Sequence, residues 1–175
     1  MFDDLRAANL NYAATFDLAG LSPEAGRGLG LVTCIDTRIE PLAALGLRPG
    51  DAKILRNAGG RVTDDVLRSL VLATALLGVN RIAIMHHTKC ALAGRSDDQL
   101  RSALGTEQRI ATSDWTFLAM PEPDAALSAD VRTVRNCPAL PADVAVEGWR
   151  FDVDTGLVHT IVAIDGASID SGSND

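Results

Sequence analysis

The stretch LGLVTCIDTR, residues 29–38, decides the fold because a continuous apolar run ends abruptly in charged residues. Its apolar part, Leu29 to Ile35, does not alternate between apolar and polar positions as a half-exposed strand would. A run of this kind is typical of a strand buried on both faces of a parallel sheet. The polar end, Asp36-Thr-Arg38, then predicts a loop at the carboxyl end of that strand.

The sequence that follows contains the parts of a βαβ unit. Residues 52–55 form a second short apolar run, and residues 81–85 form a third. Between them, Thr63 is a good helix N-cap, and an apolar segment from 66 to 77 leads to Gly78 at a helix stop position. Strand, helix and strand in this order predict parallel strands joined by a right-handed crossover. We therefore expect a single α/β domain with a mainly parallel β-sheet flanked by helices.

The remaining signals are more local. Ser96 and Gln99 predict a capping box for a helix that ends before Gly105. Asp154-Thr-Gly156 predicts the turn of a hairpin, with antiparallel strands at a sheet edge near the C-terminus. The folded domain is expected to span 1–165, and the tail rich in Ser, Asp and Gly, 166–175, to be disordered. The other expected elements are helices at 3–18, 41–45 and 124–136, strand candidates at 110–112 and 115–120, and hairpin strands at 144–153 and 157–164.

Composition argues against several functional classes. A chain of 175 residues suits one domain, and its net charge of −7 opposes binding to nucleic acid or an anionic membrane surface. Acidic residues near Met1 stand where a signal peptide needs basic ones, and no apolar run approaches the roughly 20 residues of a membrane span. The protein is therefore expected to be cytoplasmic. Three cysteines, an odd and small number, favour reduced thiols over a disulfide framework.

Metal-ligand residues follow two of the predicted strands. The first set is Cys34 with Asp36 and Arg38, and the second is His86-His87-Thr-Lys-Cys90. Because ligands bind beyond the carboxyl ends of parallel strands, the two sets are expected to meet. If the chain turns into helix after the third strand, a His and a Cys three apart lie on one side of its first turn. Two thiolates and an imidazole select zinc, and the lack of a nearby fourth Cys or His indicates a catalytic site with one open position.

These residues also have ordinary structural explanations. Taken alone, Cys34 would more often be a buried apolar thiol. Asp36 and Arg38 could form a loop salt bridge of little energetic value. His86 competes with His87 for the role of ligand, although adjacent residues of a strand point to opposite faces.

Three motifs in register resemble the β-class carbonic anhydrases. They are CIDTR at 34–38, RNAGG at 56–60 and HTKC at 87–90, and the pattern of that family is C-x-D-x-R followed by H-x-x-C. The surrounding sequence resembles the smaller, archaeal-and-actinobacterial-like branch. The resemblance implies zinc-dependent, reversible hydration of carbon dioxide to bicarbonate. It also implies a homodimer or a larger homo-oligomer.

Carried onto this sequence, the resemblance implies one zinc ion per chain on Cys34, His87 and Cys90. Asp36 and Arg38 become the catalytic pair, in which Asp36 either orients the reactive water or itself joins the metal. A neighbouring loop is expected to offer backbone N–H groups as part of the substrate pocket. That loop consists of Asn57, Ala58, Gly59 and Gly60.

Two alternatives to carbonic anhydrase activity stay open at this point. The same fold and ligand set serve hydrolases of carbon disulfide or carbonyl sulfide, and a catalytically silent relative could bind zinc or respond to redox conditions through its thiolates. The sequence also departs from the H-x-x-C-G pattern of the family. Lys89, where the similar branch often has aspartate, adds positive charge beside the site, and Ala91 replaces a glycine, so its Cβ could shift the Cys90 loop.

Overall fold

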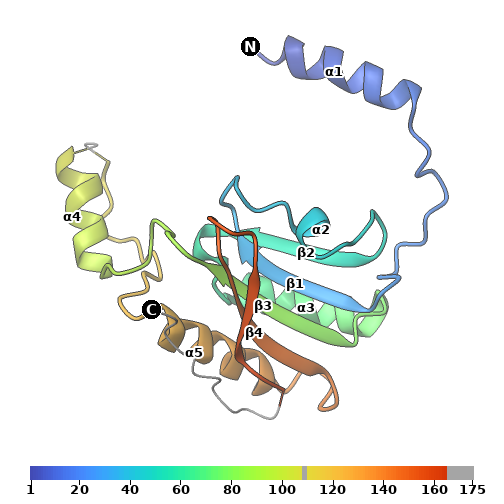
Figure 1. Cartoon of the computed structure of the whole chain (residues 1–175). Coiled ribbons are helices and arrows are strands. Elements are labelled where there is room, and N and C mark those ends of the chain that lie inside the picture. Colours follow the sequence, from blue (N-terminus) through green and yellow to red (C-terminus); the bar gives the residue numbers. More distant parts are fainter. Residues whose placement is uncertain (108–109, 165–175) are drawn as a thin grey trace.

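A five-stranded β-sheet forms the centre of the molecule (Figure 1). The computed structural model describes residues 1–107 and 110–164. The strands lie in the order β2-β1-β3-β4-β5, and every neighbouring pair is parallel except β4 and β5, which are antiparallel. The expected α/β domain with an antiparallel hairpin at one edge is thus confirmed. The strands are β1 (Leu29–Cys34), β2 (Ala52–Asn57), β3 (Arg81–His87), β4 (Ala145–Phe151) and β5 (Val158–Val162).

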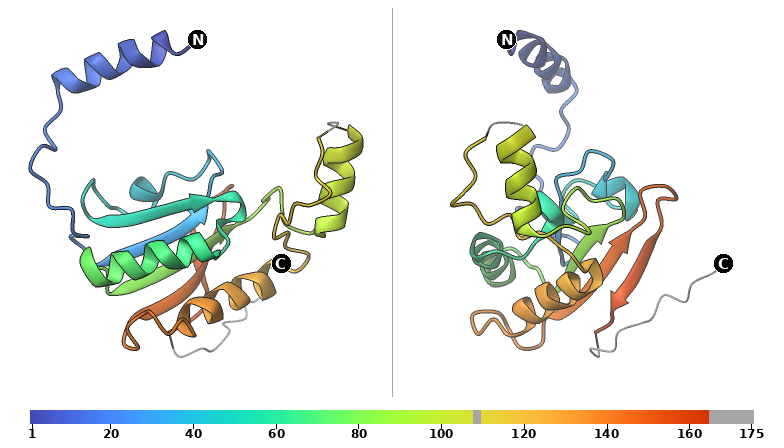
Figure 2. Two further views of the ribbon diagram at one scale, coloured as in Figure 1. Left: turned by 180° about the vertical axis from the view of Figure 1, so that it is seen from behind. Right: turned by 90° about the vertical axis from the view of Figure 1, so that its left-hand side faces the viewer.

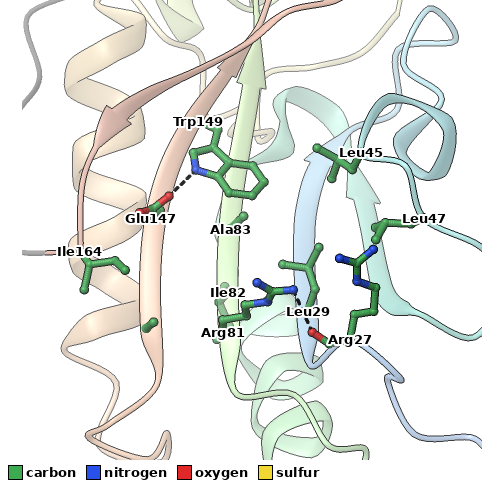
Figure 3. Close-up of a pocket in the computed structure, with 11 residues that line it drawn as sticks. Arg27, Leu29, Leu45, Leu47, Arg81, Ile82, Ala83, Glu147, Trp149 and Ile164 are labelled. Carbon is green, nitrogen blue, oxygen red and sulfur yellow. Dashed lines mark hydrogen bonds between the residues drawn. The ribbon is translucent and has the colours of Figure 1, made fainter.

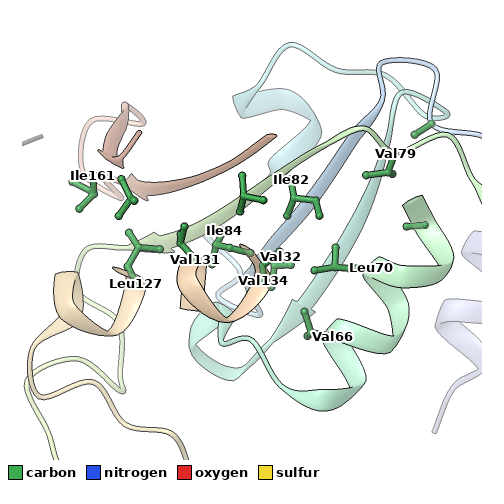
Figure 4. Packing of buried hydrophobic residues seen from close by; sticks show 14 residues of the cluster. Val32, Val66, Leu70, Val79, Ile82, Ile84, Leu127, Val131, Val134 and Ile161 are labelled. Atoms are coloured by element: carbon green, nitrogen blue, oxygen red, sulfur yellow. The ribbon is translucent and has the colours of Figure 1, made fainter. Parts of the chain in front are cut away.

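Two helices, α3 (Asp64–Leu76) and α5 (Pro123–Arg135), cover one face of the sheet (Figure 4). Thr63 caps α3 as predicted, because its hydroxyl oxygen accepts a hydrogen bond from the backbone N–H of Val66. Buried residues recur every three or four positions along both helices and therefore face the strands. Together they form the larger core cluster, which includes Val32, Val66, Leu70, Ile82, Ile84, Leu127, Val131 and Val134.

The opposite face of the sheet packs against α2 (Pro41–Ala44) and loop residues instead of long helices. Leu31 and Met85 are fully buried there together with Ile39. Cys34 and Cys90 belong to the same cluster. The candidate thiolate ligands therefore lie on the less covered face, at the carboxyl ends of the strands.

Two helices project from this body (Figures 1 and 2). The first, α1 (Asp3–Ala14), is shorter than expected and has no buried residue. The second, α4 (Asp97–Glu107), begins with the predicted capping box, since Ser96 and Gln99 exchange hydrogen bonds between backbone N–H groups and side chains. No helix among the described residues is long and apolar enough to cross a membrane.

Some sequence expectations about secondary structure are wrong. The segments 110–112 and 115–120 are not strands, apart from one isolated bridge between Ala93 and Met120. Their apolar residues do not form one buried side, since Trp115 is 64% exposed whereas Met120 is buried. The helix after Ser96 also continues past Gly105, because one glycine costs a helix only about 1 kcal/mol. The tail predicted to be disordered, 166–175, lies outside the described residues.

Candidate metal centre

Cys34, His87 and Cys90 bring their possible ligand atoms within 4.8 Å of one another. Cys34 is the last residue of β1, and His87 is the last residue of β3. The chain passes from β1 to β2 on one side and then to β3 on the other side of β1. The carboxyl ends of β1 and β3 therefore flank the crevice in which open parallel sheets bind their ligands.

The imidazole of His87 has the orientation that a metal requires. Its Nδ1 lies 2.9 Å from the carbonyl oxygen of Thr88, which only accepts hydrogen bonds, so Nδ1 carries the proton. Nε2 then has a free lone pair, and this buried atom has no hydrogen-bond partner among the described residues. A buried imidazole lone pair beside two sulfur atoms fits zinc.

His86 faces the other way. Its Nε2 lies 3.2 Å from Oδ2 of Asp130 on α5 and takes no part in the cluster. The two adjacent histidines thus point to opposite sides of β3, as neighbouring residues in a strand do. Of the other candidate ligand residues, Cys137 is half-buried beyond α5, and His159 is exposed on β5.

The neighbouring thiols of Cys34 and Cys90 have pKa shifts in opposite directions. The hydrogen bond from Cys90, opposed by burial, lowers the pKa of Cys34 to about 4. Backbone N–H groups of Asp36 and Gly59 also lower the pKa of Cys34. The hydrogen bond to Cys34, followed by burial, raises the pKa of Cys90. A divalent cation between the sulfurs favours loss of both protons, since thiolates are the metal-binding form.

The chain does not enter a helix after β3, so the helical arrangement considered for His87 and Cys90 is wrong. Residues 88–91 form a turn instead, in which the Thr88 N–H donates to the Phe151 carbonyl oxygen at 2.9 Å. Lys89 adopts the left-handed region, with φ of 55°. This reversal of the backbone returns Cys90 toward His87.

The two departures from the family pattern have different structural consequences. Ala91 is exposed, and its φ is not positive, so the glycine of the family is not needed there to relieve a left-handed backbone. The residue in that conformation is Lys89. Its Nζ lies 2.6 Å from Oδ2 of Asp154 in the hairpin turn, and both side chains are more than half exposed. The added positive charge is therefore paired outside the cluster.

Asp36 and Arg38 form a forked ion pair beside the cluster. Nε of Arg38 donates to Oδ1 of Asp36 at 2.9 Å, and one terminal nitrogen donates to Oδ2 at 2.7 Å. The Arg38 backbone N–H also donates to Oδ1 at 2.9 Å. Hydrogen bonds from the Arg38 side chain, and then from its backbone, hold the pKa of Asp36 well below its usual range. Asp36 is therefore an ionised hydrogen-bond acceptor.

The loop after β2 is held against the cluster by its own side chains. Asn57 closes it with two hydrogen bonds to the backbone of Arg61, at 2.7 and 2.8 Å. Within the loop, Gly59 and Gly60 have φ of 79° and 66°. A Cβ on Gly60 would lie only 3.0 Å from the backbone of Thr33, so glycine alone fits between β1 and β3. The side chain of Asn57 thus shapes the loop, and backbone groups face the site.

No role was predicted from the sequence for three polar residues that lie beside the cluster or contact the segments that carry it. Arg56 donates to the carbonyl oxygens of Cys34 and Asp36, at 2.9 and 2.6 Å. Arg61 and Asp130 form a buried ion pair with an N–O distance of 2.6 Å. Arg56 and Arg61 flank the glycine motif and could have been noticed. Asp130 occurs within a helix pattern and gives no local signal of its role.

The chain is similar to characterised proteins over most of its length. The carbonic anhydrase family matches residues 30–115. The chain is 32% identical over 159 residues to β-carbonic anhydrase 1 of Mycobacterium tuberculosis, covering 91% of this chain and 96% of that protein. It is 31% identical over 152 residues to a carbon disulfide hydrolase of Acidianus sp., covering 74% of each. The crystal structure of a carbonic anhydrase from Streptococcus mutans matches with a TM-score of 0.83 at 37% identity, covering 91% of this chain and 96% of that one.

Proposed function

The chain belongs to the β-carbonic anhydrase family, and we propose that its reaction, the reversible hydration of carbon dioxide to bicarbonate and a proton, takes place at Cys34, His87 and Cys90 with one zinc ion per chain. The observation that carries this assignment is the buried Nε2 lone pair of His87 beside two thiols. When bound, zinc supplies a Lewis acid that lowers the pKa of water toward neutrality.

Asp36 and Arg38 orient the reacting water in this proposal. An ionised carboxylate accepts hydrogen bonds and donates none, so a water beside Asp36 directs an O–H toward it and a lone pair elsewhere. A further hydrogen bond, 3.2 Å from Arg38 to the carbonyl oxygen of Lys89, fixes the pair to the turn that carries Cys90. The reaction then forms one bond between the water oxygen and the carbon of carbon dioxide and releases one proton.

The loop of Asn57, Ala58, Gly59 and Gly60 lines the substrate side of the site in this proposal. The Gly59 N–H is among the groups that lower the pKa of Cys34. Backbone N–H groups of the loop suit the negative charge that develops on the oxygens of carbon dioxide. The side chain of Asn57 is engaged with Arg61, so its part is to shape the loop.

The decisive test measures carbon dioxide hydration by stopped flow together with the zinc content of the same preparation. We expect about one zinc per chain and hydration that disappears when a chelator removes the metal. The same preparation is offered carbon disulfide. Hydrolysis of carbon disulfide without hydration of carbon dioxide would assign the sulfur chemistry instead. Stoichiometric zinc without either activity would identify a silent zinc-binding relative.

We also propose that the protein is a homo-oligomer in which α1 packs on a second copy. Beside the less covered face of the sheet, at the amino ends of β1, β3 and β4, lies a mainly apolar cavity of about 270 Å³ (Figure 3). Parallel sheets are normally covered on both faces. Residues around this cavity include Leu29, Leu45, Leu47, Ala83 and Trp149, with Arg27 and Arg81 among the charged ones.

The exposed helix α1 has the complementary chemistry. Leu5, Leu10 and Tyr12 are each more than half exposed, and Asp3 and Asp4 begin the helix. Apolar side chains of α1 would fill the cavity of the partner, and its acidic first turn would face the arginines at the cavity. The arrangement is reciprocal between two copies, which is the usual symmetry of a dimer.

Sedimentation velocity tests this interface. We expect wild type to sediment as a dimer or larger assembly. The Arg27→Glu variant should already dissociate at protein concentrations at which wild type remains assembled. Combining Arg27→Glu with Asp3→Arg and Asp4→Arg should restore assembly, whereas Arg68→Glu on the exposed side of α3 serves as the charge control. A wild type that stays monomeric at all concentrations contradicts the proposal.

We place the protein in the cytoplasm because its two proposed thiolate ligands need a reducing compartment.

A further inference from the structure

The carboxylate of Asp130 connects two segments that carry the metal centre. Asp130 lies on α5 and is only 4% exposed. Oδ2 accepts a hydrogen bond from Nε of Arg61 at 2.6 Å, and Oδ1 accepts one from a terminal nitrogen of Arg61 at 3.2 Å. The same Oδ2 lies 3.2 Å from Nε2 of His86. Although burial opposes ionisation, His86 and Arg61 hold the pKa of Asp130 below its usual range.

The two residues that contact Asp130 belong to segments that carry proposed zinc ligands or pack against them. His86 is the neighbour of His87 in β3. Arg61 follows Gly60, which packs closely against the backbone of Thr33 and Cys34, and Asn57 binds the Arg61 backbone from the other end of that loop. Arg61 also donates to the carbonyl oxygen of Leu118. Asp130 itself is not a member of the cluster.

We propose that Asp130 is a positioning residue for the metal centre, acting through Arg61 on the loop that faces Cys34 and through His86 on the end of β3 that presents His87. The proposal rests on the assignment of Cys34, His87 and Cys90 as ligands. A carboxylate that receives a bidentate arginine fixes the direction of that arginine, and a buried arginine without its partner would have to move toward water. The loop would then lose its ion pair with α5.

The test uses Asp130→Asn, which keeps the shape of the side chain but removes its charge and one acceptor. Zinc affinity is measured by competition with a chromophoric chelator, and the geometry of the site by the thiolate-to-metal absorption of the cobalt-substituted protein. We expect zinc affinity to fall about 10- to 100-fold, as for other residues that orient metal ligands, and the cobalt spectrum to change. Arg61→Lys, which keeps a positive charge but loses the fork, should behave in the same way and replaces Asp130→Asn if that variant does not fold.

Arg135→Gln is the matched control on the same helix. Arg135 donates to the carbonyl oxygens of Val146 and Ala163, away from the metal centre, so its loss should lower thermal stability and leave zinc affinity unchanged. Hydrogen exchange of segment 57–61 in zinc-free protein gives an independent reading, and we expect it to be faster in Asp130→Asn. Failure of wild type to bind zinc would refute the ligand assignment but leave this exchange test. Folded Asp130→Asn with wild-type zinc affinity, cobalt spectrum and loop exchange would refute the positioning role.

Discussion

Oδ2 of Asp36 lies 3.8 Å from Nε2 of His87, beside the proposed metal position but beyond hydrogen-bonding distance. Arg38 accounts for this separation, because its guanidinium engages both carboxylate oxygens. The carboxylate can therefore orient a water at the site, or approach the metal if the arginine releases it. Arg38 favours the first arrangement, since it offers Asp36 a bidentate partner away from the cluster.

Replacing Arg38 by alanine should retain zinc but remove most hydration activity. No ligand is lost, yet Asp36 becomes free to occupy the open metal position. Asp36→Asn should likewise keep zinc and lose the correct orientation of the water. Rates are compared at roughly pH 6.5 to 9, where the pKa of Asp36, lowered further by Arg38, leaves it ionised in wild type. Arg48→Ala, an exposed arginine before β2, is the control. Near-wild-type rates in both dyad variants would exclude the pair from the mechanism.

Single alanine substitutions of Cys34, His87 and Cys90 should each strip zinc from the purified protein. Each removes one of only three donors within the cluster, and the remaining two do not hold the ion through purification. Cys137→Ala is the matched control because its thiol lies outside the cluster and should leave zinc content unchanged. Metal analysis of the four proteins decides the matter, and near-stoichiometric zinc in all three ligand variants would contradict the assignment.

Ala91→Gly should leave zinc content and hydration rate unchanged while lowering stability slightly. Ala91 has no positive φ, so glycine relieves no strain there and adds freedom to the unfolded chain, at a cost of about 0.4–1 kcal/mol. The contrasting variant is Lys89→Gly, which relieves a left-handed residue but loses the ion pair with Asp154. Thermal unfolding with metal analysis compares the two. A marked rise in hydration rate for Ala91→Gly would show that the alanine restrains the Cys90 turn after all.

Asp97→Asn should lower the free energy of unfolding by about 1–3 kcal/mol at neutral pH. The Asp97 carboxylate accepts hydrogen bonds from the backbone N–H groups of Ala119 and Phe117, at 2.8 and 2.9 Å. The bond from Ala119 is the largest of the influences that lower the pKa of Asp97. A carboxyl group whose pKa is lowered in the folded state adds stability at pH values above its ordinary pKa near 4. This added stability disappears as the pH falls through the pKa of the folded state.

Urea unfolding should therefore show a difference in the free energy of unfolding between wild type and Asp97→Asn. We expect this difference to be constant from about pH 7 to 5 and to shrink below about pH 4. Asp98→Asn is the neighbouring control, because the Asp98 side chain is 91% exposed and pairs with Arg101 instead of backbone N–H groups. A difference for Asp97→Asn that persists unchanged at the lowest pH would show that charge plays no part in this contact.

The sequence predicted the fold correctly for segments whose pattern of apolar and polar residues matches their burial in the folded protein. The unbroken apolar run of β1 is typical of a buried strand, and Thr63 marked the start of α3. The segment around Trp115 was predicted wrongly as a strand, because its apolar residues do not share one side: Trp115 is exposed, whereas Met120 is fully buried. Apolar content without a period therefore carried little information about that segment.

The three residues that cluster were expected to meet from the sequence, but the backbone geometry that brings them together was not. Cys34, His87 and Cys90 followed from motif spacing, but the turn that joins the last two depends on Lys89 in a conformation that lysine rarely adopts. The partnership of Arg61 with Asp130 joins residues far apart in the chain, and no local pattern encodes it. Only the packing of α5 against the sheet brings them together.

Cys34 and His87 lie at the ends of neighbouring strands of the sheet, yet α2, β2 and α3 separate them along the chain. An ion that joins them acts as a reversible cross-link, and it restricts the unfolded chain only while it is bound. The population of unfolded molecules must then depend on the free concentration of the metal. In a cell, the lifetime of this protein against proteolysis would therefore follow zinc supply, so scarcity of the ion would reduce abundance as well as the activity of each molecule.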